Sequence, residues 1–268
     1  MILPAFHCVP DLDPELMTPS LLSLPIFAFV AFAVGGLNAA EPAIIAKARA
    51  QLGTEAALEA VRSVQYKGTV VAIDPKDPTK QSKSSIEIIA QKPDQQRVLA
   101  QSEKAVETTV IDGYEGWQRT QEINNPKARR FVVFKPDAVK RLRAQAWENL
   151  SFFRGSERFG ARVEEQGTKT IDGIECIRVA FIYAPTIIFY RYFDPATGRL
   201  VQTETEDGGV TREEGERIVN GVRFPERMKM TIKGAGGQSQ NVTVHLETIV
   251  VNETFPAEIF RMPGPMQQ

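Results

Sequence analysis

Few residues in this chain have the types and spacing that catalysis or metal binding requires. The 268-residue sequence contains no GxSxG, HExxH or phosphate-binding loop motif, and its two cysteines and two histidines have no metal-ligand spacing. His245 lies in the apolar pattern VTVHLE and Cys176 in GIECIRV, which favours structural roles for both. We therefore expect no catalytic residue, no metal site and no cofactor.

Paired carboxylates occur in two short segments, TETEDGG at 203–209 and TREEGER at 211–217. Two carboxylates can divide acid and base roles when both face one cleft. Here the acids cluster at predicted turns, where a solvated hairpin end is the simpler interpretation. An enzyme acting on an envelope polymer is an alternative that requires two of these carboxylates to converge in a cleft.

The first 40 residues are typical of an export signal. Residues 21–34 form an apolar block of fourteen residues, and the small residues after it suit cleavage near Ala39 or Ala40. The segment before the block is acidic instead of basic, which suggests Met17 as an alternative start. An uncleaved membrane anchor is the competing interpretation. We predict a signal peptide over 1–40 and a single domain over 41–268.

A basic run follows later, with seven Lys and Arg residues between Lys127 and Arg143 and Asp137 as its single acid. Phe131 and Phe134 interleave with these charges, a mixture that nucleic-acid binding can use. Export argues against that, so we expect no nucleic-acid partner and favour a solvated helix face. The remaining hypothesis is contact of Lys140, Arg141 and Arg143 with acidic lipid headgroups or an acidic partner surface.

Three stretches predict helices. AIIAKARAQLG after Pro42 has a helical apolar spacing and ends at Gly53, and Thr54 can cap a second helix. Residues 136–155 contain an apolar stripe at near-helical spacing, which ends at Gly155. Elsewhere, turn residues such as Asp112-Gly113, Asp172-Gly173 and Asn220-Gly221 divide the chain into roughly ten strands of an antiparallel meander.

The segment IIFYRYF, residues 187–193, is apolar or aromatic on both faces of a predicted strand. Ile187, Phe189 and Phe193 share one side, and Ile188, Tyr190 and Tyr192 share the other. Such a strand must be covered on both sides. We expect a mainly β (α+β) fold in which a curved antiparallel sheet has a wet convex face. Helices cover its apolar concave face and leave a pocket where they fill it incompletely.

The order of these motifs resembles that of the LolA-like outer-membrane lipoprotein-sorting proteins. The resemblance spans nearly all of residues 41–268 and rests on QYKGTVV, IDGYEGWQR, TIDGIECIRVAF, YRYFDPATGRLVQTE, IVNGVRFPERMKMTI and VNETFPAEIFRMP. It implies a half-open β-barrel with helices in its mouth, in the periplasm of a double-membraned bacterium.

The resemblance also implies a carrier that binds the acyl chains of a lipoprotein or another lipid in an apolar cavity. Such a carrier moves its cargo toward the outer membrane and meets inner- and outer-membrane protein partners. The alternative is an envelope regulatory or scaffolding protein that binds a partner protein with the same fold. No lipobox is present, which argues against a membrane-anchored receptor. The positions carried over to the cavity are Trp117, Leu142, Trp147, Leu150, Ile187, Phe189, Tyr190 and Tyr192.

Overall fold

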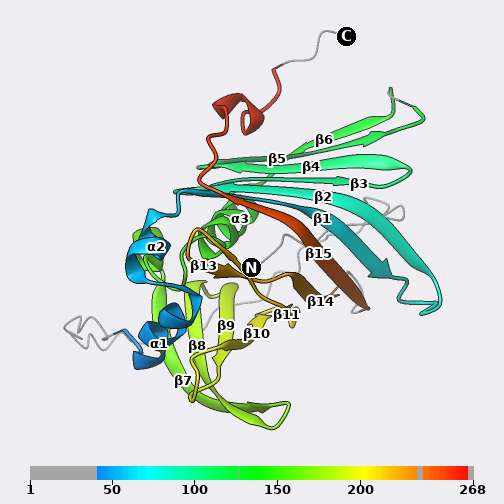
Figure 1. Ribbon diagram of the computed structural model, residues 1–268. Helices are drawn as coiled ribbons and strands as arrows, with labels where there is room; N and C mark the ends of the chain where they lie inside the picture. Colours follow the sequence, from blue (N-terminus) through cyan, green and yellow to red (C-terminus); the bar gives the residue numbers. More distant parts are fainter. Residues whose placement is uncertain (1–40, 126, 234–237, 265–268) are drawn as a thin grey trace, which may run out of the picture. The chain divides into compact units, whose positions relative to one another are not determined.

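The computed structural model describes residues 41–125, 127–233 and 238–264, so the predicted signal peptide lies outside the described residues. Its main feature is a 13-stranded antiparallel sheet (Figure 1). The strand order is β6-β5-β4-β3-β2-β1-β15-β14-β11-β10-β9-β8-β7. The strands of this sheet are β1 (Ser63–Ile73), β2 (Gln81–Gln91), β3 (Gln95–Gln101), β4 (Ala105–Asp112), β5 (Glu115–Glu122), β6 (Arg129–Val133), β7 (Arg162–Ile171), β8 (Ile174–Ala184), β9 (Ile187–Phe193), β10 (Leu200–Thr205), β11 (Val210–Glu214), β14 (Arg227–Lys233) and β15 (Ser239–Val251).

The sheet is an antiparallel meander whose first and last strands pair with each other, so that two other strands form its open edges. The first strand, β1, pairs with the last, β15, as well as with β2, and within the described chain β6 and β7 remain the two edges. A separate two-stranded ribbon joins β12 (Arg217–Val219) to β13 (Val222–Phe224). The predicted half-open antiparallel barrel is therefore confirmed, although ten strands was an underestimate.

Local sequence signals account for the hairpins and for part of the curvature. Asp172-Gly173 and Asn220-Gly221 all have positive φ angles of 48° to 82°, the conformation that tight hairpin turns require. At Gly68 the β1–β15 register shifts, and a Cβ on this residue would lie 1.8 Å from the carbonyl oxygen of His245. This bulge increases the local twist of the two central strands, and only glycine fits it.

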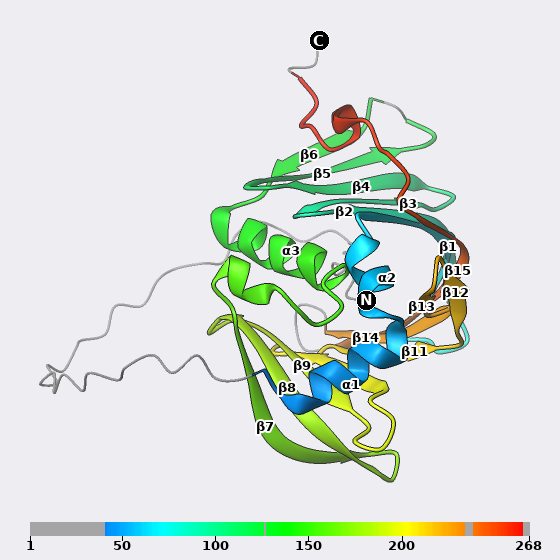
Figure 2. The ribbon, with the colours of Figure 1, turned by 60° about the vertical axis from the view of Figure 1, so that its left-hand side comes forward.

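Among the described residues, three α-helices lie on the concave side of the sheet (Figure 2): α1 (Ala43–Leu52), α2 (Glu55–Ala60) and α3 (Pro136–Glu148). The Thr54 hydroxyl accepts a hydrogen bond from the amide of Ala57 at 3.2 Å, as its predicted capping role requires. Helix α3 begins at a proline but ends earlier than Gly155, so Leu150 belongs to the turn that follows it. No helix of the described ranges is long and apolar enough to cross a bilayer.

The two faces of β9 are buried in different ways, one under helices and the other only by side chains of neighbouring strands. Ile187 and Phe189 are buried against Ile44 and Ile45 of α1 and against Trp147 of α3. On the opposite face, the apolar side chains of Tyr190 and Tyr192 pack with those of β7, β8 and β10 in a smaller cluster that contains Ile171, Ile174, Cys176 and Val201.

The outer face of the sheet is also partly covered, contrary to the wet convex face that was expected. Ile111 and Gly116 face α3, so their neighbours Val110 and Trp117 face the other way. On that outer face the C-terminal segment packs through Phe260, which is fully buried, and Trp117 stacks on Phe131 at 5.7 Å. The apolar outward residues of β2, β4, β5 and β6 explain why this part of the convex face needs a cover.

Candidate functional site

A cavity of about 560 Å³ lies beside the first two turns of α3, and we call it the α3 cavity. Its apolar walls come from four places: the β4–β5 turn, the start of α3, the 3₁₀ helix η1 (Ser156–Phe159) and β8. The β4–β5 turn and β8 are distant in the sequence and meet here because the sheet curves around α3 (Figure 2). The lining residues are Tyr114, Phe134, Pro136, Val139, Lys140, Arg143, Ala144, Arg158, Phe159 and Tyr183.

The charged residues that line the α3 cavity are all basic. Arg143 is held in place, because its guanidinium lies 2.7 Å from Asp94 and 3.8 Å from the centroid of the Tyr114 ring. Lys140 and Arg158 are exposed, and neither forms an ion pair with any residue that the structure describes. The site therefore combines apolar walls with two positive charges that are free to meet an anionic group.

Three buried polar side chains connect the C-terminal end of α3 to the sheet. Tyr183 of β8 donates a hydrogen bond to Glu148, and Arg191 of β9 places Nη1 2.5 Å from the other carboxylate oxygen. The Arg191 guanidinium also lies between the rings of Phe153 and Phe181, with 4.8 and 4.6 Å to their centroids. Burial and the Glu148 carboxylate raise the pKa of Tyr183, so the phenol stays protonated and keeps donating.

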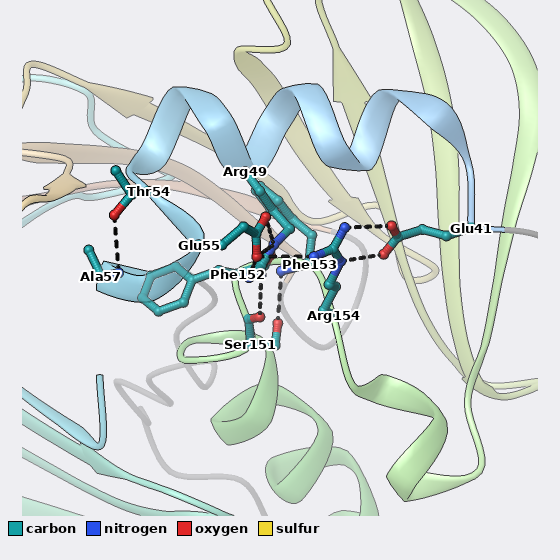
Figure 3. A network of polar contacts seen from close by, with 9 residues as sticks. All are labelled: Glu41, Arg49, Thr54, Glu55, Ala57, Ser151, Phe152, Phe153 and Arg154. Carbon is teal, nitrogen blue, oxygen red and sulfur yellow. Dashed lines mark hydrogen bonds and ion pairs between the residues drawn. The ribbon is translucent and has the colours of Figure 1, made fainter. Parts of the chain in front are cut away.

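A second polar network joins α1 to the segment after α3 (Figure 3). The side chain of Arg49 is almost fully buried and donates to the carbonyl oxygen of Phe152 at 2.7 Å and to Glu55 at 2.6 Å. Arg154 donates to Glu41 at 2.8 Å and to Glu55 at 3.0 Å. The hydrogen bond from Arg49 lowers the pKa of Glu55, so the carboxylate stays charged. This network holds a turn that is strained, since Phe152 has a φ of 48°.

A second cavity, of about 380 Å³, lies between α1, the Phe152 turn and the β12–β13 ribbon. Its lining is mixed, with acids of the TREEGER segment facing Arg199 and Arg223. These carboxylates are committed to ion pairs, such as Glu214 with Lys229 at 2.8 Å and Glu216 with Arg223. The hydrogen bond from Lys229 lowers the pKa of Glu214, which therefore is not a proton donor at neutral pH.

Two of the three TETEDGG acids, Glu204 and Glu206, are not the solvated turn residues that were expected, whereas Asp207 is exposed in the turn. Glu204 accepts hydrogen bonds from Lys169 at 2.6 Å and from Tyr192 at 2.7 Å. Burial alone would raise the pKa of Glu204, but these bonds together lower it. Glu206 forms an ion pair with Arg141 of α3. Within the residues that the structure describes, no group of three or more His, Cys, Asp and Glu side chains could hold a metal ion.

None of the eight residues that were predicted to line an apolar cavity lines either of the two cavities described above. Tyr190, Tyr192 and Trp117 face away from the helices, so their assignment to the concave face is corrected. The other five residues lie in α3, in the turn after it, or on the face of the sheet that the helices cover. They line neither cavity: Leu142, Trp147, Leu150, Ile187 and Phe189. The largest of these side chains are buried in close contact and fill the space that the prediction left empty.

Two of the three predicted basic contact residues do line the α3 cavity, namely Lys140 and Arg143. Arg141 lies instead against the sheet, where it pairs with Glu206 and donates to the carbonyl oxygen of Thr186. Sequence reasoning missed Tyr114, Phe159 and Tyr183. Only Tyr114 carried a signal, as an aromatic residue in an exposed DGYEG turn.

Comparison with proteins of known structure identifies the fold. No protein-family model matches this chain, and no curated protein sequence matches it. A LolA superfamily protein from Nitrosomonas europaea is similar in structure, with 12% identity and a TM-score of 0.52, over 82% of this chain and 96% of that one. A domain assigned to outer-membrane lipoprotein sorting, from Vibrio parahaemolyticus, has 12% identity and a TM-score of 0.50, over 81% and 94% of the two chains.

A third similar structure is a DUF1329 family protein from Desulfovibrio piger, with 9% identity and a TM-score of 0.51, over 82% of this chain and 96% of that one. At such identities the similarity is one of fold, which by itself assigns no activity. This chain has the half-open barrel fold of the LolA superfamily.

Proposed function

We propose that this protein is a periplasmic carrier that binds the acyl chains of a lipoprotein or another lipid and moves them toward the outer membrane. The proposal rests on the α3 cavity, which has apolar walls and two cations, Lys140 and Arg158, that form no ion pair with the described part of the chain. Apolar walls suit an acyl chain, and the cations suit the anionic group at its end. The apolar block at 21–34 and the LolA-type fold support export to the periplasm.

The size of the α3 cavity supports binding of a chain without any chemical step. Its volume falls in the range of roughly 300–1,000 Å³ typical of small-molecule sites. Burial of about 300 Å² of apolar ligand surface is worth roughly 7 kcal/mol at 25 cal/mol per Å², before the entropy cost of binding. Binding energy of this size is enough for a carrier, so we propose no catalytic activity.

Helix α3 is the element whose movement would enlarge the site for longer or multiple chains. It is attached to the sheet by the ion pairs Arg141–Glu206, Arg143–Asp94 and Glu148–Arg191, and it packs on Ile111 of β4. A ligand that separates α3 from β4 and β8 shifts the protein toward an open state by its preferential affinity for that state. Release follows when a membrane or a partner offers the chains a better apolar environment.

Uptake of a fluorescent C16 fatty acid by purified residues 41–268 tests the proposal. We expect saturable binding of one probe that unlabelled palmitate displaces. K140E/R158E should weaken binding of the acid about tenfold, because the charges opposite the carboxylate are reversed, and should leave a methyl-ester probe unaffected. No saturable uptake by the wild-type protein would overturn the carrier proposal.

Cavity-filling variants locate the bound chain. Ala144→Phe adds a ring inside the α3 cavity and should reduce uptake of both probes, whereas Leu52→Phe adds the same bulk to the second cavity and serves as the matched control. Circular dichroism of each variant establishes that it is folded. Equal loss of uptake in both variants would mean that the probe does not bind beside α3.

A further inference from the structure

Strand β6 forms one open end of the sheet. It pairs with β5 in an uninterrupted register from Gln121↔Arg129 to Trp117↔Val133. On its other side, no strand of the described residues adds to it. Its backbone is therefore a free edge, the kind of surface on which another chain can add a strand.

The hydrogen bonds at the two ends of the β5–β6 pair show which backbone groups of β6 have no partner in β5. The amide of Phe134 donates to Gly116 at 2.9 Å, and the amide of Glu122 donates to the carbonyl of Ala128 at 3.1 Å. Even-numbered residues of this strand thus bond to β5. Because antiparallel ladders alternate, the N–H and C=O groups of Arg129, Phe131 and Val133 point outward.

The side chains of this edge define the partner that it fits. Arg129 and Arg130 are exposed, and Val133 is an apolar residue that is 55% exposed. Between Lys127 and Lys135 every charged residue is basic. The half-buried ring of Phe131 stacks on Trp117 of the neighbouring strand β5.

The opposite edge of the sheet is protected against strand addition, and β6 is not. In β7 the register shifts between Glu165 and Thr168, where Gly167 has a φ of 76°, so a bulge interrupts the free edge. β7 also carries charges of both signs, whereas β6 has an even register and one sign of charge.

We propose that β6 is a docking edge for an extended, acidic segment of a partner protein, which adds to the sheet as an additional strand. The added backbone would bond to Arg129, Phe131 and Val133, its acidic residues would lie beside Arg129 and Arg130, and its apolar residues beside Val133. Self-pairing of two β6 edges is disfavoured, because it brings two strands of like charge together. This site is separate from the α3 cavity and does not depend on the proposed carrier function.

A peptide with the sequence TVIVEE, blocked at both ends and fluorescently labelled, is the probe. We expect saturable binding to residues 41–268 by fluorescence anisotropy, and weak or no binding of the matched peptide TVIVKK. Palmitate at saturating concentration should leave peptide binding unchanged, which separates failure of this proposal from failure of the carrier proposal. In NMR hydrogen exchange, the amides of Arg129, Phe131 and Val133 should become protected while the peptide is bound.

Two variants at one position test strand addition itself. Val133→Pro removes an outward-facing donor without breaking the β5 ladder and should weaken binding about tenfold. Val133→Thr keeps the donor and should retain most of the affinity. R129E/R130E should exchange the preference of the protein from TVIVEE to TVIVKK.

Three results would overturn the proposal. One is equal affinity of the Val133→Pro and wild-type proteins for TVIVEE. Another is binding of phosphatidylglycerol vesicles with no binding of the peptide, which would make the basic edge a membrane contact. The third is self-association in sedimentation experiments that R129E/R130E abolishes, which would make a second copy the occupant.

Discussion

The carboxylate of Glu148 at the end of α3 lies 2.5 Å from Nη1 of Arg191 in β9, and both side chains are almost completely buried. This ion pair is a direct link between the helix and the strand on which the concave core is built. Desolvation makes such a pair a poor source of net stability, but removing one partner leaves an uncompensated charge in the core.

Replacement of Glu148 by Ala should lower the free energy of unfolding by about 3–5 kcal/mol, because Arg191 then has no counter-charge and Tyr183 loses its acceptor. Urea denaturation followed by circular dichroism measures this loss. The double variant E148M/R191M removes both charges and should recover most of the stability. A loss below about 1 kcal/mol for Glu148→Ala would show that water reaches the pair.

The two faces of β9 should respond differently to truncation. Phe189→Ala should cost about 3–5 kcal/mol, since the ring is fully buried against α1 and the hole cannot collapse easily. Tyr190→Ala should cost roughly 1 kcal/mol, because this side chain is half-exposed and loses mainly its contact with the Arg178 guanidinium, 4.1 Å from the ring centroid. Thermal and urea unfolding of both variants give the comparison, and equal costs would contradict the assignment of faces.

Phe260→Ala should release the C-terminal segment from the outer face. The ring is fully buried beside Trp117, and its loss should cost about 3 kcal/mol and expose the indole to water. The emission of Trp117 should shift to longer wavelength, which is measured in a Trp147→Phe background so that one tryptophan reports. Arg261→Ala, at an exposed neighbouring position, is the control and should leave the emission unchanged.

Lys92 gives the protein a pH dependence on the alkaline side. Burial, followed by repulsion from Arg62 and Arg49, lowers the pKa of Lys92 from 10.5 to about 8. Between these two values the unfolded chain binds more protons than the folded one, so stability should rise with pH from about 8 toward 10.5. Solvent screening of this half-buried amine keeps the gain to about 1 kcal/mol.

The Lys92→Met variant isolates this effect. Above pH 10 the raised pKa of Tyr183 acts in the opposite direction, because the unfolded tyrosine loses its proton first and stability then falls. Both proteins share that decline, so the difference between their unfolding free energies should grow from pH 8 to pH 10 in favour of the wild type. A constant difference across this range would contradict the lowered pKa.

Local features of the fold could be predicted because their signals are contained in a few neighbouring residues. The cap at Thr54 and the turn at Asn220-Gly221 depend on side-chain chemistry and backbone freedom within four positions. The order of these signals was sufficient to indicate the LolA-type half-barrel. The end of α3 was placed too late because its apolar stripe continues into the turn, where Phe153 adopts a φ of 71°.

The candidate site could be predicted only in part, through Lys140 and Arg143. Strand periodicity separates Phe189 from Tyr190 but does not say which of the two faces a helix. That choice depends on α1, which lies far away in the sequence. The same holds for Trp117, whose cover is the C-terminal segment.

The sequence by itself thus determined the local caps and turns, the type of the main elements and the antiparallel meander. The tertiary structure decided which faces are filled, which charges are paired and where space remains. The physical reason is that propensity, capping and turn chemistry act between near neighbours, whereas burial, the Glu148–Arg191 pair and the α3 cavity arise from contacts between distant segments.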